Sequence, residues 1–154
     1  MYRVVREGLD PLATTGSLQA GGRFNSPGAF GALYTSFEAE TAVQEVGRAL
    51  RQRGIDPAGF PPGSWWIYEL EVALRAVLDL TDSSVLGQLE IQKASLAGPD
   101  LGVTRKIAAE AREGGCEALL VPSAAVPESR NLVIFPDMLP EPVLVRSSQP
   151  VDLR

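Results

Sequence analysis

Four side chains in this sequence have types and surroundings that suit chemistry on a sugar or a phosphate: Arg23, Tyr34, Glu45 and Ser123. Arg23 follows two glycines, which let a ligand approach the backbone closely, and a guanidinium offers fixed donors to phosphate or ribose oxygens. The segment lacks the Gly-x-x-x-x-Gly-Lys-Ser/Thr pattern of a P-loop. A surface turn with a solvated arginine is the alternative, and these residues alone favour it.

Glu45 lies among small apolar residues of a predicted helix, with Ala42 and Ala49 on the same face. Burying an unpaired carboxylate costs free energy, so Glu45 needs either access to water or a partner such as Arg23 or a ligand hydroxyl. The pattern leaves both interpretations open: a solvated edge of the helix, or the floor of a pocket.

Tyr34 lies in a predicted strand, where its ring can stack on an aromatic ligand or belong to the core. Ser123 and Asn131 belong to a loop bracketed by prolines, where Ser and Asn commonly bond to nearby backbone groups. Core packing and turn formation are the simpler interpretations of these three residues when each is taken alone.

The composition excludes several catalytic classes. The chain contains no histidine, so Ser-His-Asp and Cys-His catalysis and His-containing zinc sites are excluded. Cys116 is the only cysteine, which rules out an internal disulfide or a Cys-x-x-Cys redox pair. The residues around Cys116 are typical of the start of a buried strand, which favours an inert thiol over a nucleophile.

The charge balance also narrows the possible partners. Lys and Arg number 14 and Asp and Glu 19, a formal charge of −5, which argues against a nonspecific grip on nucleic acid. A small anionic ligand needs only one or two placed cations and stays possible. The first residues lack the apolar run of a signal peptide, and no stretch approaches the length of a membrane span. We expect a cytoplasmic protein that binds neither nucleic acid nor membranes directly.

The candidate residues are carried by a predicted α+β fold, because strands and helices follow one another without strict alternation. A single domain covering residues 1–154 is long enough to fold without a disulfide or a metal. Residues 8–22 are predicted to form an exposed loop, and Ser36 to cap a helix over 37–53. The other expected helices span 82–91 and 103–112, and the expected strands 2–5, 33–36, 66–72, 77–80, 118–121, 132–135 and 143–145.

One predicted strand has a clear alternation of side chains. Trp66, Tyr68, Leu70 and Val72 occupy alternate positions, with glutamates between them. This period of two predicts a strand that buries those four side chains on one face and exposes the glutamates on the other.

Taken together, these pieces resemble the RES-domain family, the toxin half of a widespread bacterial toxin–antitoxin system. The resemblance covers nearly the whole chain in order. In the family, an Asn-Pro pair often follows the late asparagine, whereas this chain has Ile134-Phe135-Pro136-Asp137 there. The matching segments are Tyr2-Arg3-Val4, residues 21–28, Leu33-Tyr34-Thr35-Ser36, residues 41–46, and Pro122-Ser123-Ala124 followed by Asn131.

The resemblance implies a mixed β core flanked by helices, similar to ADP-ribosyltransferases, and cleavage of NAD⁺ between nicotinamide and ribose. This cleavage passes through an oxocarbenium-like state, which a carboxylate near the sugar stabilises. By resemblance, Glu45 holds the ribose hydroxyls and stabilises the developing positive charge, and Arg23 binds the diphosphate or orients the ribose. Tyr34 is expected to stack on the nicotinamide, and Ser123 to bond the carboxamide or the ribose.

The same resemblance implies further binding residues and partners. Arg3, Gly22, Asn25, Ser36 and Asn131 are candidates for holding the dinucleotide, NAD⁺ being a substrate and no metal being required. ADP-ribose can pass to water or to phosphate, which would make the chain an NAD⁺ glycohydrolase or phosphorylase. It can also pass to a protein, which would make it a mono-ADP-ribosyltransferase. A non-catalytic nucleotide- or partner-binding module is the remaining alternative. The expected partner is a cognate antitoxin with an Xre-like DNA-binding part.

Overall fold

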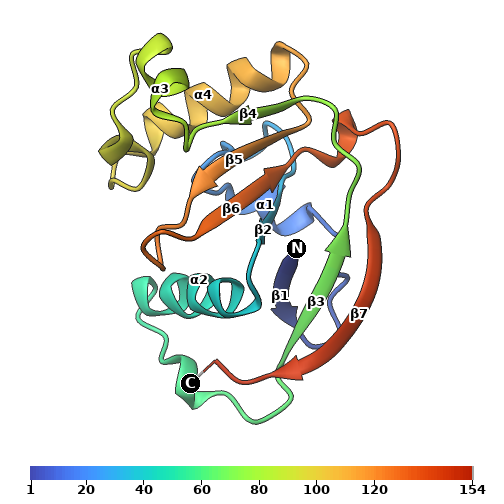
Figure 1. Cartoon of the computed structure of the whole chain (residues 1–154). Coiled ribbons are helices and arrows are strands. Elements are labelled where there is room, and N and C mark those ends of the chain that lie inside the picture. Colours follow the sequence, from blue (N-terminus) through green and yellow to red (C-terminus); the bar gives the residue numbers. More distant parts are fainter. Residues whose placement is uncertain (154) are drawn as a thin grey trace.

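A computed structural model describes residues 1–153, which form a twisted seven-stranded sheet in the order β4-β5-β6-β2-β1-β3-β7 (Figure 1). β4 and β5 pair in parallel, and the other pairs are antiparallel. This mixed sheet, flanked by helices, confirms the predicted α+β class. The strands are β1 (Tyr2–Arg6), β2 (Leu33–Ser36), β3 (Trp65–Glu71), β4 (Val77–Asp79), β5 (Ala118–Pro122), β6 (Arg130–Ile134) and β7 (Leu144–Val151).

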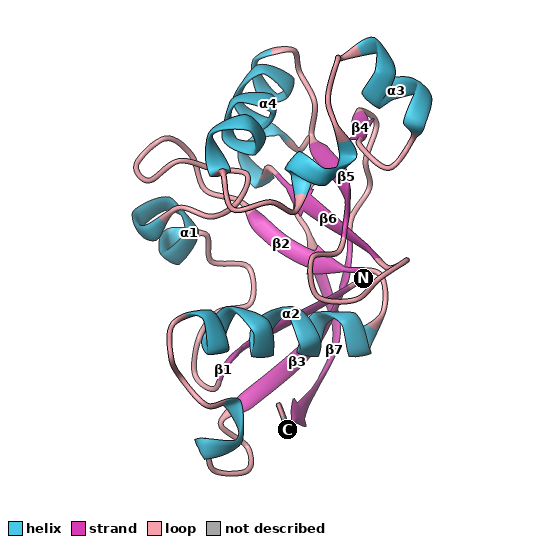
Figure 2. Cartoon of the chain, turned by 90° about the vertical axis from the view of Figure 1, so that its left-hand side faces the viewer, coloured by secondary structure: helices cyan, strands magenta, loops and turns pink. Residues whose placement is uncertain are grey.

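Figure 2 shows how the helices are arranged around the sheet, with α1 at the left of the view and α3 at the upper right, near β4. There β2 is visible between α1 and α4 on one side and α2 on the other, and α2 crosses in front of β1 and β3. The α-helices are α1 (Thr15–Ala20), α2 (Ala39–Gln52), α3 (Ser83–Gln88) and α4 (Leu101–Glu113); 3₁₀ turns occur at Pro57–Gly59, Lys93–Leu96 and Pro136–Met138.

Local sequence explains how α3 and α4 begin. Asp82 Oδ1 accepts a hydrogen bond from Ser84 N at 2.7 Å, and Asp100 Oδ1 accepts one from Gly102 N at 2.8 Å. Each aspartate satisfies a backbone donor that the first helical turn leaves free. The same rule fails at α2.

The predicted cap of α2 by Ser36 is wrong. The N-cap residue is Glu38, which makes no side-chain cap hydrogen bond. Ser36 is still part of β2 and lies opposite Asn131 in β6. Its hydroxyl donates to Asn131 Oδ1 at 2.7 Å, so strand pairing has taken the group that the helix end would have used.

Residues 8–22 are not a plain loop, because they contain α1. No residue of this six-residue helix is buried, so a local apolar pattern does not mark it. Distant contacts hold it instead: Ser17 Oγ donates to Ala32 O at 2.8 Å, and Asn25 Nδ2 donates to Ser17 O at 2.7 Å. A short helix is marginal alone and needs such tertiary support.

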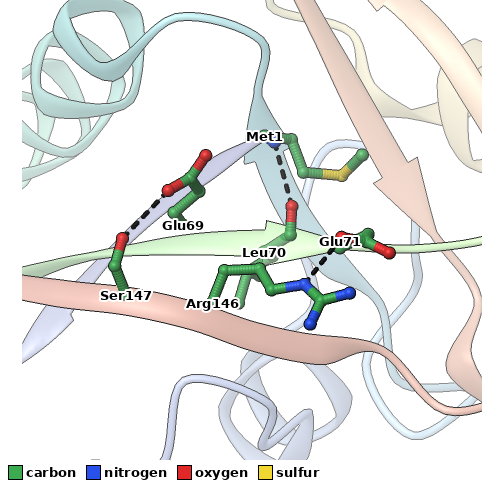
Figure 3. A network of polar contacts seen from close by, with 6 residues as sticks. All are labelled: Met1, Glu69, Leu70, Glu71, Arg146 and Ser147. Carbon is green, nitrogen blue, oxygen red and sulfur yellow. Dashed lines mark hydrogen bonds and ion pairs between the residues drawn. The ribbon is translucent and has the colours of Figure 1, made fainter.

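The alternation predicted for β3 holds in its second half and fails in its first. Leu70 is buried in one apolar cluster with Tyr68 and Val72, whereas Ile67 is buried in another cluster together with Ala42 and Leu50 of α2. The register shift between Glu69 and Leu70 adds a residue to β7 and leaves the alternation of β3 itself unchanged. The predicted exposure of Glu69 and Glu71 is confirmed. Glu69 Oε2 accepts from Ser147 Oγ at 2.9 Å and Glu71 Oε2 accepts from Arg146 Nε at 2.6 Å, both contacts with β7 (Figure 3).

The main apolar core anchors the segment that carries Arg23. Phe24 and Phe30 are both buried, and Phe30 packs edge-to-face on Phe135 with ring centroids 5.4 Å apart. Aromatic pairs of this kind fix the relative position of the segments that carry them. The turn that contains Arg23 is therefore held on its C-terminal side.

Candidate active site

A cavity of about 790 Å³ opens between α2 and the turn at residues 21–24. Its lining comes from α1, α2, α4 and four strands, so segments far apart in sequence meet there. Glu45, Tyr34 and Arg23 all line it. The volume lies within the range typical of small-molecule sites.

Glu45 is anchored through one of its two carboxylate oxygens. Oε1 accepts hydrogen bonds from Ser123 Oγ and Asn131 Nδ2, both at 2.6 Å. The backbone amides of Ala124 and Ala125 add donors at 3.0 and 3.3 Å. Oε2 accepts no hydrogen bond from any residue of the described chain, so it is available to a ligand. The carboxylate is thus held rigidly with one oxygen free.

The partners of Glu45 come from the 123–131 segment rather than from Arg23. The Ser123 hydroxyl donates its proton to Glu45 and accepts from the amides of Ala125 and Val126 at 3.1 and 3.0 Å. Ser123 does not line the cavity. Its geometry therefore suits positioning of the carboxylate, by a hydroxyl with one proton to donate.

Tyr34 organises the turn that carries Arg23. Its hydroxyl donates to Asn25 Oδ1 at 2.7 Å and accepts from Phe24 N at 3.0 Å. Burial raises the pKa of Tyr34 to about 12, with the hydrogen bond from Phe24 acting in the opposite direction. The phenol therefore keeps its proton near neutral pH. A Cβ on Gly22 would overlap the Tyr34 hydroxyl, so this turn requires glycine at its closest approach.

The remaining predicted binding residues divide into two groups. Asn25 is fully buried and does not line the cavity; its amide also donates to Phe30 O at 3.0 Å, which makes it part of the scaffold. Arg3, Gly22, Ser36 and Asn131 do line the cavity.

Arg3 Nη2 donates to Ala13 O at 3.2 Å, whereas its buried Nη1 has no partner. Burial lowers the pKa of Arg3 to about 10, opposed by the charge of Asp10.

Sequence reasoning missed three arginines of the cavity, Arg48, Arg53 and Arg105. Arg48 follows Glu45 by three positions on the helix, a spacing that could have placed both on one face. Arg105 has no comparable signal, since α4 reaches the site only through the fold. Its Nε donates to Gly22 O at 3.0 Å.

Arg23 is oriented by backbone carbonyls. Its Nη1 donates to Gly98 O at 2.6 Å. Its pKa is lowered, first by burial and then by the positive charge of Arg48, while Glu45 and Tyr34 act in the opposite direction. The side chain thus lies within electrostatic range of another cation and of the Glu45 carboxylate.

Within residues 1–153, no group of three or more His, Cys, Asp or Glu side chains is arranged to hold a metal ion. In the same part of the chain, no helix is both long and apolar enough to cross a bilayer.

The fold and the site together define a mixed sheet with a single anchored carboxylate in a cavity lined by arginines. The RES domain matches residues 1–154, so the chain belongs to the RES domain family, as the sequence resemblance predicted. The anchored Glu45 and the Arg23 turn are the parts of that resemblance which the fold brings into one cavity.

Two mycobacterial proteins are similar in sequence. "Probable NAD(+) phosphorylase Rv3189" of Mycobacterium tuberculosis (strain ATCC 25618 / H37Rv) is 32% identical over 133 residues, covering 84% of this chain and 62% of that protein. "NAD(+) phosphorylase MbcT" of Mycobacterium bovis (strain ATCC BAA-935 / AF2122/97) is 26% identical over 123 residues, covering 80% of this chain and 66% of that protein. The matches thus span just under two thirds of each relative.

The fold is similar to a solved one. The crystal structure of the M. tuberculosis MbcT-MbcA toxin-antitoxin complex contains a chain that matches with a TM-score of 0.86 and 24% identity. The match covers 99% of this chain and 83% of that one. At this identity, the likeness establishes the fold.

Proposed function

We propose that this chain is a toxin that consumes NAD⁺, cleaving the bond between nicotinamide and ribose and transferring ADP-ribose to inorganic phosphate. The observation that carries the proposal is Glu45, whose Oε1 is held by four donors while Oε2 stays free in the cavity. The relatives named NAD(+) phosphorylases support phosphate as the acceptor.

The reaction needs a fixed negative charge beside the ribose. As the bond to nicotinamide breaks, its electron pair neutralises the pyridinium nitrogen and positive charge develops on the sugar. The free oxygen of Glu45 would hold the ribose hydroxyls and stabilise that charge. A preorganised carboxylate does this without reorganising during the reaction. An oxygen of the acceptor phosphate then bonds to the ribose carbon.

The rest of the cavity would bind the dinucleotide. Arg23, held by Gly98 O, presents its remaining donors to the diphosphate or the ribose. Tyr34 lines the cavity and would stack on the nicotinamide. Arg3 and Asn131 would support the substrate from β1 and β6.

The solved neighbour is the toxin of a toxin–antitoxin complex, which supports a cognate antitoxin for this chain as well. We propose that such an antitoxin neutralises the activity, that it carries an Xre-like DNA-binding part, and that the pair acts in the cytoplasm.

The test is to incubate the purified chain with NAD⁺, with and without inorganic phosphate, and to identify the products by mass spectrometry. Nicotinamide with ADP-ribose 1″-phosphate, formed by wild type and not by Glu45→Gln, is the expected result. ADP-ribose as the main product despite phosphate would identify a hydrolase. A labelled protein band in lysate would identify an ADP-ribosyltransferase, and NAD⁺ that binds but survives would identify a binding module. Each of these three outcomes contradicts the proposal.

A further inference from the structure

The cavity carries far more positive charge than the chain as a whole. Its lining includes five arginines and one carboxylate, that of Glu45, although the chain has a formal charge of −5. A bound NAD⁺ brings two phosphate charges and one compensating pyridinium charge, so it neutralises only part of this excess. The remaining cations favour a second anion. The five arginines are Arg3, Arg23, Arg48, Arg53 and Arg105.

Of these five arginines, Arg48 is the one whose position in the cavity no contact of its guanidinium accounts for. Its guanidinium has no hydrogen bond or ion pair with any residue of the described chain, although the side chain is half-buried. Arg23 and Arg105 are each tied to a backbone carbonyl, at 2.6 and 3.0 Å. Arg53 lies exposed beyond the end of α2. No nitrogen of Arg48 is buried without a partner, so its donors are accessible from the cavity and available to an anion.

The position of Arg48 relative to Glu45 is set by the helix. Residues three apart on a helix lie on the same face, nearly one turn from each other, and both of these side chains line the cavity. Arg23 lies within electrostatic range of both, since the charge of Arg48 lowers its pKa and that of Glu45 opposes the change. Arg23 and Arg48 therefore line the same cavity as Glu45, within electrostatic range of each other, and no carboxylate is bonded to either guanidinium.

We propose that Arg48 binds the acceptor phosphate, with Arg23 giving one of its donors to this phosphate and the others to the dinucleotide, an inference that rests on the proposed function. The two guanidiniums hold one phosphate oxygen against the ribose carbon. The bond to nicotinamide breaks with its electron pair remaining on the ring nitrogen, and the held phosphate oxygen then bonds to the ribose carbon. Arg48 thereby determines whether phosphate or water accepts ADP-ribose.

Phosphate binding is tested first without NAD⁺. Calorimetric titration of inorganic phosphate would compare wild type with Arg48→Ala, Arg48→Lys and the control Arg51→Ala. Arg51 is an exposed arginine of α2 that does not line the cavity. Losing a charge-assisted contact is expected to weaken phosphate binding about tenfold in Arg48→Ala, with partial recovery in Arg48→Lys. Equal binding by all four proteins would overturn the inference.

Turnover then separates this inference from the proposed function. In Arg48→Ala, the KM for phosphate is expected to rise about tenfold and ADP-ribose to replace the phosphorylated product, while the KM for NAD⁺ changes by about twofold or less. A raised KM for NAD⁺ with an unchanged KM for phosphate would overturn the inference and assign Arg48 to the dinucleotide. If wild type releases no nicotinamide, the proposed function fails. Weaker phosphate binding by Arg48→Ala would then show that Arg48 binds an anion, but the assignment of that anion as an acceptor would fail too.

Discussion

The side-chain amide of Asn131 donates to Glu45 Oε1 at 2.6 Å across 86 residues of sequence. The same amide accepts from Ser36 Oγ at 2.7 Å, which fixes its orientation because only the Nδ2 end can then face the carboxylate. One chain of hydrogen bonds thus runs from β2 through β6 to α2. It aims the carboxylate on which the proposed reaction depends.

Asn131→Asp is expected to lower kcat for nicotinamide release by about 100-fold, as removal of a preorganised donor does elsewhere. The aspartate replaces a donor by a second carboxylate at hydrogen-bond distance from Glu45. Asn131→Ala removes the donor without adding that repulsion, so it is expected to keep more activity. If Asn131 only fills space, the isosteric aspartate will instead be the milder change.

Ser123→Ala is expected to lower kcat about tenfold and to leave the KM for NAD⁺ unchanged, because the lost hydroxyl contacts Glu45 and three other donors to Oε1 remain. Ser123→Thr keeps a hydroxyl and should retain most of the activity. Steady-state kinetics over a range of NAD⁺ concentrations provides the comparison. An increase in KM would instead show that Ser123 contacts the substrate.

Gly22→Ala is expected to reduce the free energy of unfolding by about 1–3 kcal/mol, because the new Cβ would overlap the Tyr34 hydroxyl and force the turn to move. Gly87→Ala in α3 is the matched control. Its Cβ would meet open space, and the change should stabilise the helix by about 0.5–1 kcal/mol. Urea denaturation of both variants measures the difference, and equal stabilities would contradict the tight approach at Gly22.

Tyr34 makes stability depend on pH in the alkaline range. Its folded pKa of about 12 exceeds the ordinary value of 10, so the folded protein retains a proton that the unfolded chain releases between these values. Its contribution is complete below pH 10 and is lost as the pH rises toward 12, by up to about 1.4 kcal/mol per pH unit.

Tyr34→Phe lacks this titration. Near neutral pH it is expected to be less stable than wild type by about 1–3 kcal/mol, because Phe24 N and Asn25 Oδ1 lose their partner. Urea unfolding from pH 7 to pH 11 should show the two stabilities converging as the phenol of wild type ionises in the unfolded state. A constant difference across that range would contradict the raised pKa.

Strand positions were predictable where apolar β-prone runs are bounded by glycine or proline. β2 was predicted at its observed limits, and β1 and β5 each extend one residue beyond the predicted range. The short helix α1 was not predictable, because its support comes from Asn25 and Ala32 rather than from its own residues. The burial of Ile67 on the second face of β3 was missed for a similar reason, since α2 covers that residue only in the folded chain.

The candidate site was likewise predictable only in part. The candidate residues could be identified in order along the chain, and the helical spacing already placed Glu45 on a face of small side chains. The partner suggested for it, Arg23, was the wrong one for a hydrogen bond. Strand pairing brings Asn131 next to Ser36, and the loop after β5 brings Ser123 to the carboxylate.

By itself, the sequence determined the α+β class, the exclusion of histidine and disulfide chemistry, and the residues able to act on a ribose or a phosphate. Only the tertiary structure decided that Glu45 is held through Oε1 with Oε2 free, and that Arg48 lies in the cavity without a partner. The physical reason is that the two kinds of interaction depend on different separations. Hydrophobic patterning follows from residues a few positions apart, whereas a hydrogen bond requires two atoms within about 3 Å, which only strand register and loop packing can arrange.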